Sequence, residues 1–242
     1  RTLSAAIGYE WQVGADLGVL LSYPHARTDN NTRFINRNDA VVGSPWSTGL
    51  PDTLGGTTNG VASLTTVESS ARSRYNGVTV GLKRVLDPNF QFQVNYTLSW
   101  DKSDDDNERD PFTLRYAKAD ELGPEYNWSD RDQRHRFNGW AIKHIGGGLF
   151  LNSRLSIYSA QPMSESCGTN NQGTGQRAAS PQARICPDGS ILKRNTLRKD
   201  NAYFSWDLGL TWPFAVGNGR VELIAQVFNL TGADNFKDPA TG

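Results

Sequence analysis

Residues 90–100 alternate strictly between apolar and polar side chains. Every even position from Phe90 to Trp100 is apolar or aromatic, and every odd position from Gln91 to Ser99 is polar and uncharged. Because successive side chains of a strand point to opposite faces, this segment has one apolar and one polar face. Its length exceeds the roughly five or six residues usual for a soluble strand and suits a tilted strand that crosses a bilayer.

The same alternation recurs along the chain and predicts eight strands. It is weak only over 133–145, where Phe137, Trp140, Ile142 and Ile145 do not alternate cleanly. The predicted strands cover residues 3–11, 17–23, 78–82, 90–100, 133–145, 149–157, 204–212 and 221–227.

The connections alternate in length. Short turns join the strands in pairs, including one predicted over 213–219, and polar segments over about 26–72, 101–131 and 160–201 separate the pairs. This rhythm places all long loops on one side of a sheet, as in outer-membrane barrels, whereas a soluble sandwich has loops at both ends. We therefore expect an all-β, antiparallel transmembrane β-barrel segment in meander order.

The distribution of aromatic residues favours lipid over a protein core as the environment of the apolar face. Aromatic side chains lie near strand ends, as they do at the two interfaces of a membrane barrel. The opposite face carries mostly Gln, Asn, Ser, Thr and Gly, which suits a hydrated interior. The aromatic residues are Tyr9, Trp11, Tyr23, Phe90, Trp100, Phe204 and Trp212.

Composition narrows the classes of protein further. Hydrophobic residues make up 37% of the 242 residues and mean hydropathy is −0.56, which excludes a helical membrane protein but not a barrel. The formal net charge of zero argues against a nucleic-acid-binding protein. The first residue is Arg and no signal peptide is visible, so we expect a secretory signal in a preceding segment.

Five stretches resemble the C-terminal barrel region of TonB-dependent outer-membrane receptors, in particular the Oar-like group that carries a carboxypeptidase-regulatory-like domain. The most specific is SDRDQRHRF at 129–137, within 126–137, followed by AQVFNL at 225–230. The others are SRYNGVTV at 73–80, FQVNYTLS at 92–99 and SAQP at 159–162.

The resemblance implies a receptor of about 22 strands with a plug inside the barrel. Such a receptor lies in the outer membrane of a Gram-negative bacterium, contacts membrane lipid, and takes up an external ligand with energy from the TonB system. We expect residues 1–242 to be the C-terminal part of one such barrel domain, without signal peptide, plug, TonB-contacting segment or last strand. It should form an open curved sheet. The alternatives are a plain outer-membrane porin or a secreted β-rich glycan-binding module.

The long loops contain the candidate site residues. Cys167 and Cys186 are predicted to form a disulfide, because no further zinc ligands lie nearby, with free thiols as the alternative. Trp46, Tyr116 and Trp128 are candidates for stacking on a sugar or aromatic ligand, or else for packing the loops together.

Charged segments offer no convincing chemistry. The acidic run over 101–110 lacks the spacing of an EF-hand loop, so we expect a solvated loop rather than a Ca²⁺ site. The cluster over 131–136 is predicted to form salt bridges, because His135 and Asp132 on an extended strand lie roughly 10 Å apart, too far for an acid–base pair. We predict no catalytic residues, no metal, no cofactor and no enzyme activity.

Overall fold

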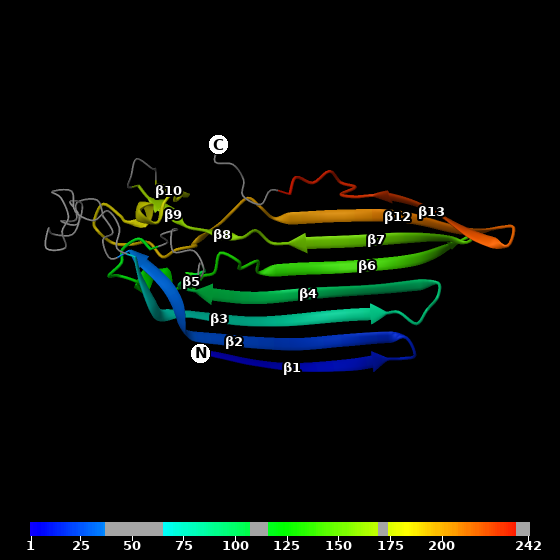
Figure 1. Cartoon of the computed structure of the whole chain (residues 1–242), viewed down its shortest axis with the longest axis horizontal. Helices are drawn as coiled ribbons and strands as arrows, with labels where there is room; N and C mark the ends of the chain where they lie inside the picture. The colour runs from blue at the N-terminus through cyan, green and yellow to red at the C-terminus, as the bar shows by residue number, and fades with distance from the viewer. Residues whose placement is uncertain (37–64, 107–115, 169–173, 236–242) are drawn as a thin grey trace.

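The computed structural model describes residues 1–36, 65–106, 116–168 and 174–235. They contain one large antiparallel sheet whose long strands follow each other in chain order (Figure 1). Within these residues, no helix is long and apolar enough to cross a membrane. The predicted all-β meander is therefore confirmed. Its long strands are β1 (Thr2–Val13), β2 (Leu17–Asn36), β3 (Thr65–Arg84), β4 (Phe90–Ser103), β6 (His135–Gly146), β7 (Leu149–Tyr158), β12 (Tyr203–Val216) and β13 (Gly219–Val227).

The sheet is open, as expected. It runs from β1 at one edge to β13 at the other, and neither edge strand pairs with a second long strand within the described residues. Every residue of β1 and β13 is exposed. An exposed strand edge presents unpaired backbone groups that readily accept another strand.

The connections differ between the two ends of the sheet. At the first, which we call the turn end, short turns join β1 to β2, β3 to β4, β6 to β7 and β12 to β13. Gly14, Gly147 and Gly217 have φ values of 70°, 58° and 60°, a left-handed conformation that glycine adopts without strain. β12 continues to Val216, so the observed turn is shorter than the predicted turn over 213–219, and the prediction is wrong in length.

The second end, which we call the loop end, carries the long connections (Figure 1). Parts of them form short elements, so these segments are more ordered than the sequence pattern indicated. The short elements are η3 (Gly123–Glu125), β5 (Asn127–Trp128), β8 (Pro162–Met163), β9 (Glu165–Cys167), β10 (Thr174–Arg177), η4 (Pro181–Arg184) and β11 (Leu197–Arg198).

β2 and β3 extend further at the loop end than predicted. In the sequence, the alternation of apolar and polar residues stops after Tyr23 and resumes at Val78. In the structure, the two strands pair along most of their length. Asn30 has φ of 59°, and the pairing register shifts beside it, so the alternation changes phase there. The loop predicted over 26–72 is therefore wrong at both of its ends, where the residues belong to β2 and β3 instead.

One face of the sheet, which we call the outward face, is mainly apolar along the middle of the long strands. Antiparallel partners point to the same side, so the register arranges these residues in rows across the sheet. Ile7 and Tyr9 are 73% and 66% exposed on this face. Such a surface requires lipid around it. One row, which crosses the seven strands from β1 to β12, consists of Tyr9, Leu21, Val80, Tyr96, Phe137, Ile157 and Phe204.

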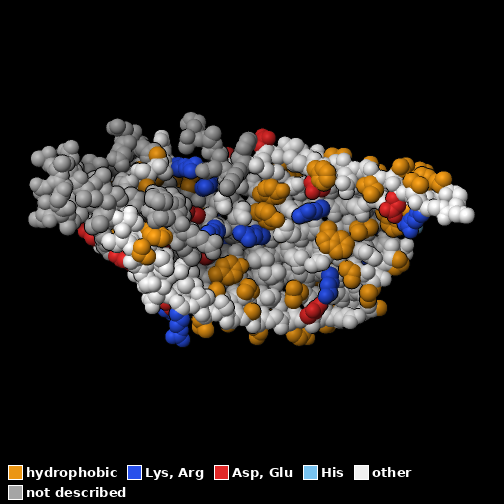
Figure 2. All heavy atoms as spheres, in the orientation of Figure 1, with side chains coloured by type: hydrophobic (Ala, Val, Ile, Leu, Met, Phe, Trp, Pro, Cys, Tyr) orange, Lys and Arg blue, Asp and Glu red, His pale blue; other side chains and the backbone are white. Residues whose placement is uncertain are grey.

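The opposite, inward face is polar. The hydroxyls of Thr79 and Thr97 lie 2.8 Å apart across neighbouring strands, and Tyr158 Oη donates to Asn138 Oδ1 at 2.6 Å. Figure 2 shows a broad face of the sheet on which lysine, arginine and acidic side chains lie along the strands, as expected of the inward face. These groups suit a water-filled interior.

β6 accounts for the weak alternation over 133–145. The register places Trp140 opposite Gln93 and Arg154 on the inward face, whereas Gly139 lies opposite Val94 on the outward face. A Cβ on Gly139 would meet Val94 Cγ1 at 2.9 Å, so only a residue without a side chain fits there. An inward tryptophan beside an outward glycine removes the clean pattern.

The two faces predict opposite responses to charge. In the intact barrel, Val80→Arg should lower the free energy of unfolding by about 2–4 kcal/mol, because it places a cation in lipid near mid-strand. Thr79→Arg, one residue away on the inward face, should cost less than about 1 kcal/mol because its side chain stays hydrated. Urea unfolding in lipid vesicles measures both, and equal losses would contradict the assignment of the faces.

Candidate functional site

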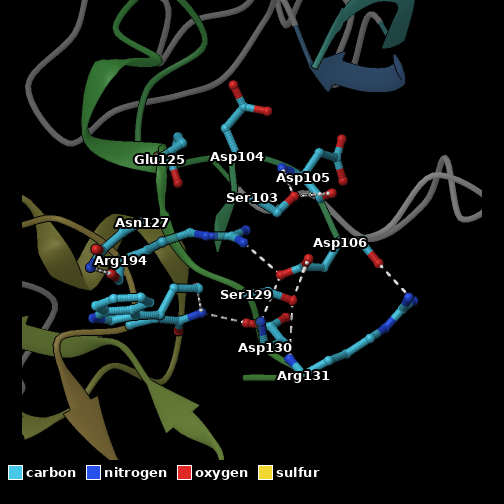
Figure 3. Close-up of polar contacts among 12 residues, drawn as sticks. Ser103, Asp104, Asp105, Asp106, Glu125, Asn127, Ser129, Asp130, Arg131 and Arg194 are labelled. Atoms are coloured by element: carbon cyan, nitrogen blue, oxygen red, sulfur yellow. Dashed lines mark hydrogen bonds and ion pairs between the residues drawn. The ribbon is translucent and has the colours of Figure 1, made fainter. Parts of the chain in front are cut away.

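The acidic residues that follow β4 lie at the centre of a polar network at the loop end (Figure 3). Asp104 Oδ2 lies 3.1 Å from Arg33 Nη2. Asp105 accepts a hydrogen bond of 2.5 Å from the hydroxyl of Tyr116. Asp106 accepts from Arg194 Nη2 at 2.5 Å. These contacts connect the end of β4 to Tyr116 in the connection that follows it, and to Arg33 and Arg194, which are 71 and 88 residues away in the sequence.

The solvated loop predicted for this acidic segment is wrong in its described part. Ser103, Asp104 and Asp105 are buried, because arginines and hydroxyl donors satisfy the carboxylates inside the protein. The Ca²⁺ alternative receives no support either, since the described residues contain no cluster of His, Cys, Asp and Glu arranged to hold a metal ion.

The second polar contact joins η3 to η4. Arg184 Nη2 donates to both carboxylate oxygens of Glu125, at 2.5 and 2.7 Å. Glu125 also accepts from the backbone N–H of Ala117 at 3.0 Å, and Arg184 Nη1 donates to the Leu192 carbonyl at 3.1 Å. Both charged side chains are almost completely buried. This ion pair therefore holds three loop segments together.

The charged cluster over 131–136 forms salt bridges, as predicted. Asp132 is fully buried and lies 3.2 Å from Arg134 Nη2 and 2.7 Å from Arg198 Nη2. His135 Nδ1 instead lies 2.7 Å from the hydroxyl of Tyr96 on β4. His135 and Asp132 thus contact different partners, and the geometry provides no acid–base pair between them.

The structure joins Cys167 and Cys186 in a disulfide with 4.9 Å between the Cα atoms. The bond connects β9 to the residue that follows Ile185, the C-cap of η4. Together with the Glu125–Arg184 pair, it fixes η4 from two sides. The loop end is consequently held by one covalent bond and several buried ion pairs.

These loop segments surround a cavity of about 600 Å³. Its wall contains more cationic than acidic side chains, even when the Asp106 and Glu125 partners of Arg194 and Arg184 are counted. Arg194 Nε is buried and has no hydrogen-bond partner within the described structure. The charged lining residues are Asp130, Arg131, Arg177, Arg184, Arg194 and Lys199.

Two of the three predicted ligand-stacking aromatics, Tyr116 and Trp128, do not line this cavity. Tyr116 is 4% exposed and its ring lies 5.7 Å below the Arg33 guanidinium, so a ligand has no open face to stack on. Trp128 is half-buried, and Lys102 and Arg134 contact its ring at 4.5 and 4.2 Å. Trp46 lies outside the described residues.

Sequence reasoning missed the cavity wall and its ion pairs. Asp106 and Arg194 are 88 residues apart, and Glu125 and Arg184 are 59 apart. No local spacing signals such pairs. Residues 177–198 contain more arginines than acidic residues. This excess is the one sequence feature that indicated acidic partners elsewhere in the chain.

Comparison with known proteins agrees with this geometry. Residues 2–191 match the profile of the outer membrane beta barrel domain family. The chain is an outer-membrane β-barrel protein of a Gram-negative bacterium and belongs to this family. A search of curated proteins found no significant match.

Two solved structures share the fold. The outer membrane transporter YddB from Escherichia coli has a TM-score of 0.62 and 12% identity, over 96% of this chain and 29% of that protein. The ferric-catecholate import receptor Fiu from E. coli K12, in its closed form, has a TM-score of 0.50 and 13% identity, over 97% of this chain and 24% of that protein. This chain thus spans less than a third of either protein.

The buried ion pair between η3 and η4 generates a stability prediction. Glu125→Gln should destabilise the loop end by about 3–5 kcal/mol, because it leaves the Arg184 cation buried without its carboxylate. Glu121→Gln should change the stability of the loop end by less than about 1 kcal/mol, because the Glu121–Lys118 pair is more exposed and longer, at 3.7 Å. Amide hydrogen exchange over 116–128 and 181–194 measures the effect. Equal protection in both variants would contradict it.

Asp101 generates a pH prediction. It lies beyond Trp100, the last outward aromatic residue of β4, and burial raises its pKa from 3.8 to about 6, with the nearby carboxylates of Asp106 and Asp132 acting in the same direction. Between about pH 4 and 6, the Asp101 carboxyl group therefore keeps its proton in the folded state and loses it in the unfolded state. The contribution of Asp101 to stability should therefore decrease as pH rises through that range.

The measurement is hydrogen exchange of the loop end in wild type and Asp101→Asn at pH 5 and pH 7. The variant cannot ionise at this position, so it should lose less protection than wild type between the two pH values. Identical changes in the two proteins would show that Asp101 does not titrate in this range.

Proposed function

We propose that this chain is the C-terminal part of the barrel of a TonB-dependent receptor of the Oar-like group, which binds an external ligand and moves it inward with energy from TonB. The open meander sheet carries this proposal. Its edges β1 and β13 are both exposed along their length, and it superposes on 29% of the YddB transporter. Flanking strands of a larger barrel would cover both edges.

The cavity at the loop end is the proposed first contact of the ligand. Long loops of outer-membrane barrels face the exterior, and a rigid scaffold often places recognition residues on its loops. The surplus of cations and the unsatisfied Arg194 Nε favour a ligand that presents carboxylate or phosphate oxygens. Trp46 remains a candidate for a further contact from the same loops.

The inward face would line the route of the ligand. Tyr158 and Tyr203 stack with their ring centroids 5.2 Å apart, and Arg136 lies directly across from Tyr158. Arg154 lies across from Asp207 further along the same face. Aromatic and guanidinium groups on one polar wall suit repeated weak contacts with a polar anionic molecule.

Energised uptake separates this proposal from a porin. The source organism, a mutant without this gene and a mutant without TonB should be grown in the same medium, and the depletion of medium components followed by mass spectrometry. We expect a compound that the first strain depletes and both mutants leave in the medium. Depletion that requires this protein but persists without TonB would identify a passive porin instead.

The upstream gene sequence tests the assignment to the Oar-like group independently. We expect it to encode a signal peptide, a carboxypeptidase-regulatory-like domain, a plug and a TonB-contacting segment. A gene without a plug would exclude the receptor and favour the porin. Release of the mature protein into the medium would instead favour the secreted glycan-binding module.

A further inference from the structure

The outward faces of β2, β3 and β4 change character together toward the loop end. The register aligns successive outward positions of the three strands, so that each step along the strands forms one row across them. The first row is apolar or aromatic, the second mixes polar and aromatic side chains, and the third is cationic. The rows are Tyr23, Val78 and Leu98; then His25, Asn76 and Trp100; then Arg27, Arg74 and Lys102.

The middle row has the character of a membrane interface. Asn76 Oδ1 accepts a hydrogen bond from Tyr23 Oη at 3.0 Å and lies 2.8 Å from His25 Nδ1. Trp100 lies directly across from Asn76 on β4. Amphipathic aromatic side chains of this kind lie where hydrocarbon meets headgroups. The hydrocarbon region therefore ends at this row.

The cationic row lies one outward step further from the hydrocarbon. Two residues along a strand correspond to about 7 Å, or about 5 Å of depth for a strand tilted by roughly 45°, which places the row in the headgroup region of about 5–7 Å. Arg27 and Arg74 are directly opposite each other, as are Arg74 and Lys102. Like charges in direct cross-strand pairs repel, so this row is unfavourable unless an anion lies between them.

The described residues only partly provide that anion. Arg27 pairs with Asp29 at 2.8 Å, and both side chains are largely exposed. Arg74 is exposed and has no carboxylate within ion-pair distance among the described residues, and Lys102 contacts the Trp128 ring rather than an acid. Within the part of the chain that the structure describes, two cations of the row therefore have no carboxylate as counter-charge.

The three cations of this row lie on the outward side of their strands. The inward residues next to the row are Ala26, Ser73 and Asp101, none of which is cationic. A ligand inside the barrel would require cations on the inward face. The cations instead continue the lipid-contacting surface, so their partner lies in the membrane around the barrel.

We propose that Arg27, Arg74 and Lys102 bind the anionic phosphate group of a lipid in the outer leaflet. Guanidinium groups bind phosphate oxygens through paired hydrogen bonds, and the lysine adds a point charge. The acyl chains of the same lipid would lie against the apolar rows below. The inference requires only the membrane location of the sheet and is independent of the transported ligand.

The test compares two double variants of the full-length protein in phosphatidylcholine nanodiscs, with phosphatidic acid as the probe lipid. Arg74→Gln/Lys102→Gln removes two outward cations at the loop end. Lys143→Gln/Arg220→Gln removes two cations near the turn end, the first outward and the second inward by the strand register, and serves as the control for overall charge. Native mass spectrometry counts bound phosphatidic acid, and heat-modifiable migration on a gel confirms that each variant is folded.

The loop-end double variant should bind phosphatidic acid about thirtyfold more weakly than wild type, since each cation contributes roughly a factor of five. The control variant should retain wild-type affinity, and Arg74→Lys/Lys102→Arg should restore most of the binding. Equal losses in both double variants would show a general charge effect and overturn the site. Full competition by inorganic phosphate at equal concentration would show a soluble anion site and also overturn the lipid assignment.

Discussion

The absence of water in a lipid bilayer is the constraint from which the structure of this protein follows. A backbone N–H or carbonyl group in hydrocarbon must find a protein partner, so strands must pair continuously from one edge of the sheet to the next. The unbroken ladder from β1 to β13 meets this requirement for all strands but the two at its edges. Those exposed edges are tolerable in a membrane only when further strands pair with them, as the proposed larger barrel would provide.

The loop end follows different physical rules, because it extends into water. Its interior is built from ion pairs rather than from a large apolar core. Glu125, Arg184 and Asp132 are among its most buried side chains, and each has a charged partner at hydrogen-bond distance. Charged groups that recognise one another directionally give these irregular segments a defined arrangement without regular secondary structure. The same arrangement leaves a cationic cavity on a rigid frame, a combination suited to capturing an anionic molecule from outside.

Each strand is also organised along its length by depth in the membrane. On β4, the outward side chains change from Val94 through Trp100 to Lys102, in the order of hydrocarbon, interface and headgroup. The inward side chains of β4 show no such gradient, since Gln93, Asn95 and Thr97 are all polar and uncharged. One face of a strand therefore contacts lipid and the other contacts water, so different residue types are favoured on the two faces. The proposed lipid site outside and the proposed ligand route inside can thus vary independently in this fold.

The amino-acid sequence alone determined the class of fold, the eight long strands and, for every strand but β6, the face that meets lipid. These features depend on alternation within one strand, as in residues 90–100, which is visible without knowledge of any neighbour. Tertiary structure decided the rest. The extension of β2 past Asn30, the inward position of Trp140 and the pairing of Glu125 with Arg184 across 59 residues all depend on which distant segments come together. Side chains far apart in sequence interact only once the sheet has placed their loops side by side, so no local pattern encodes those contacts.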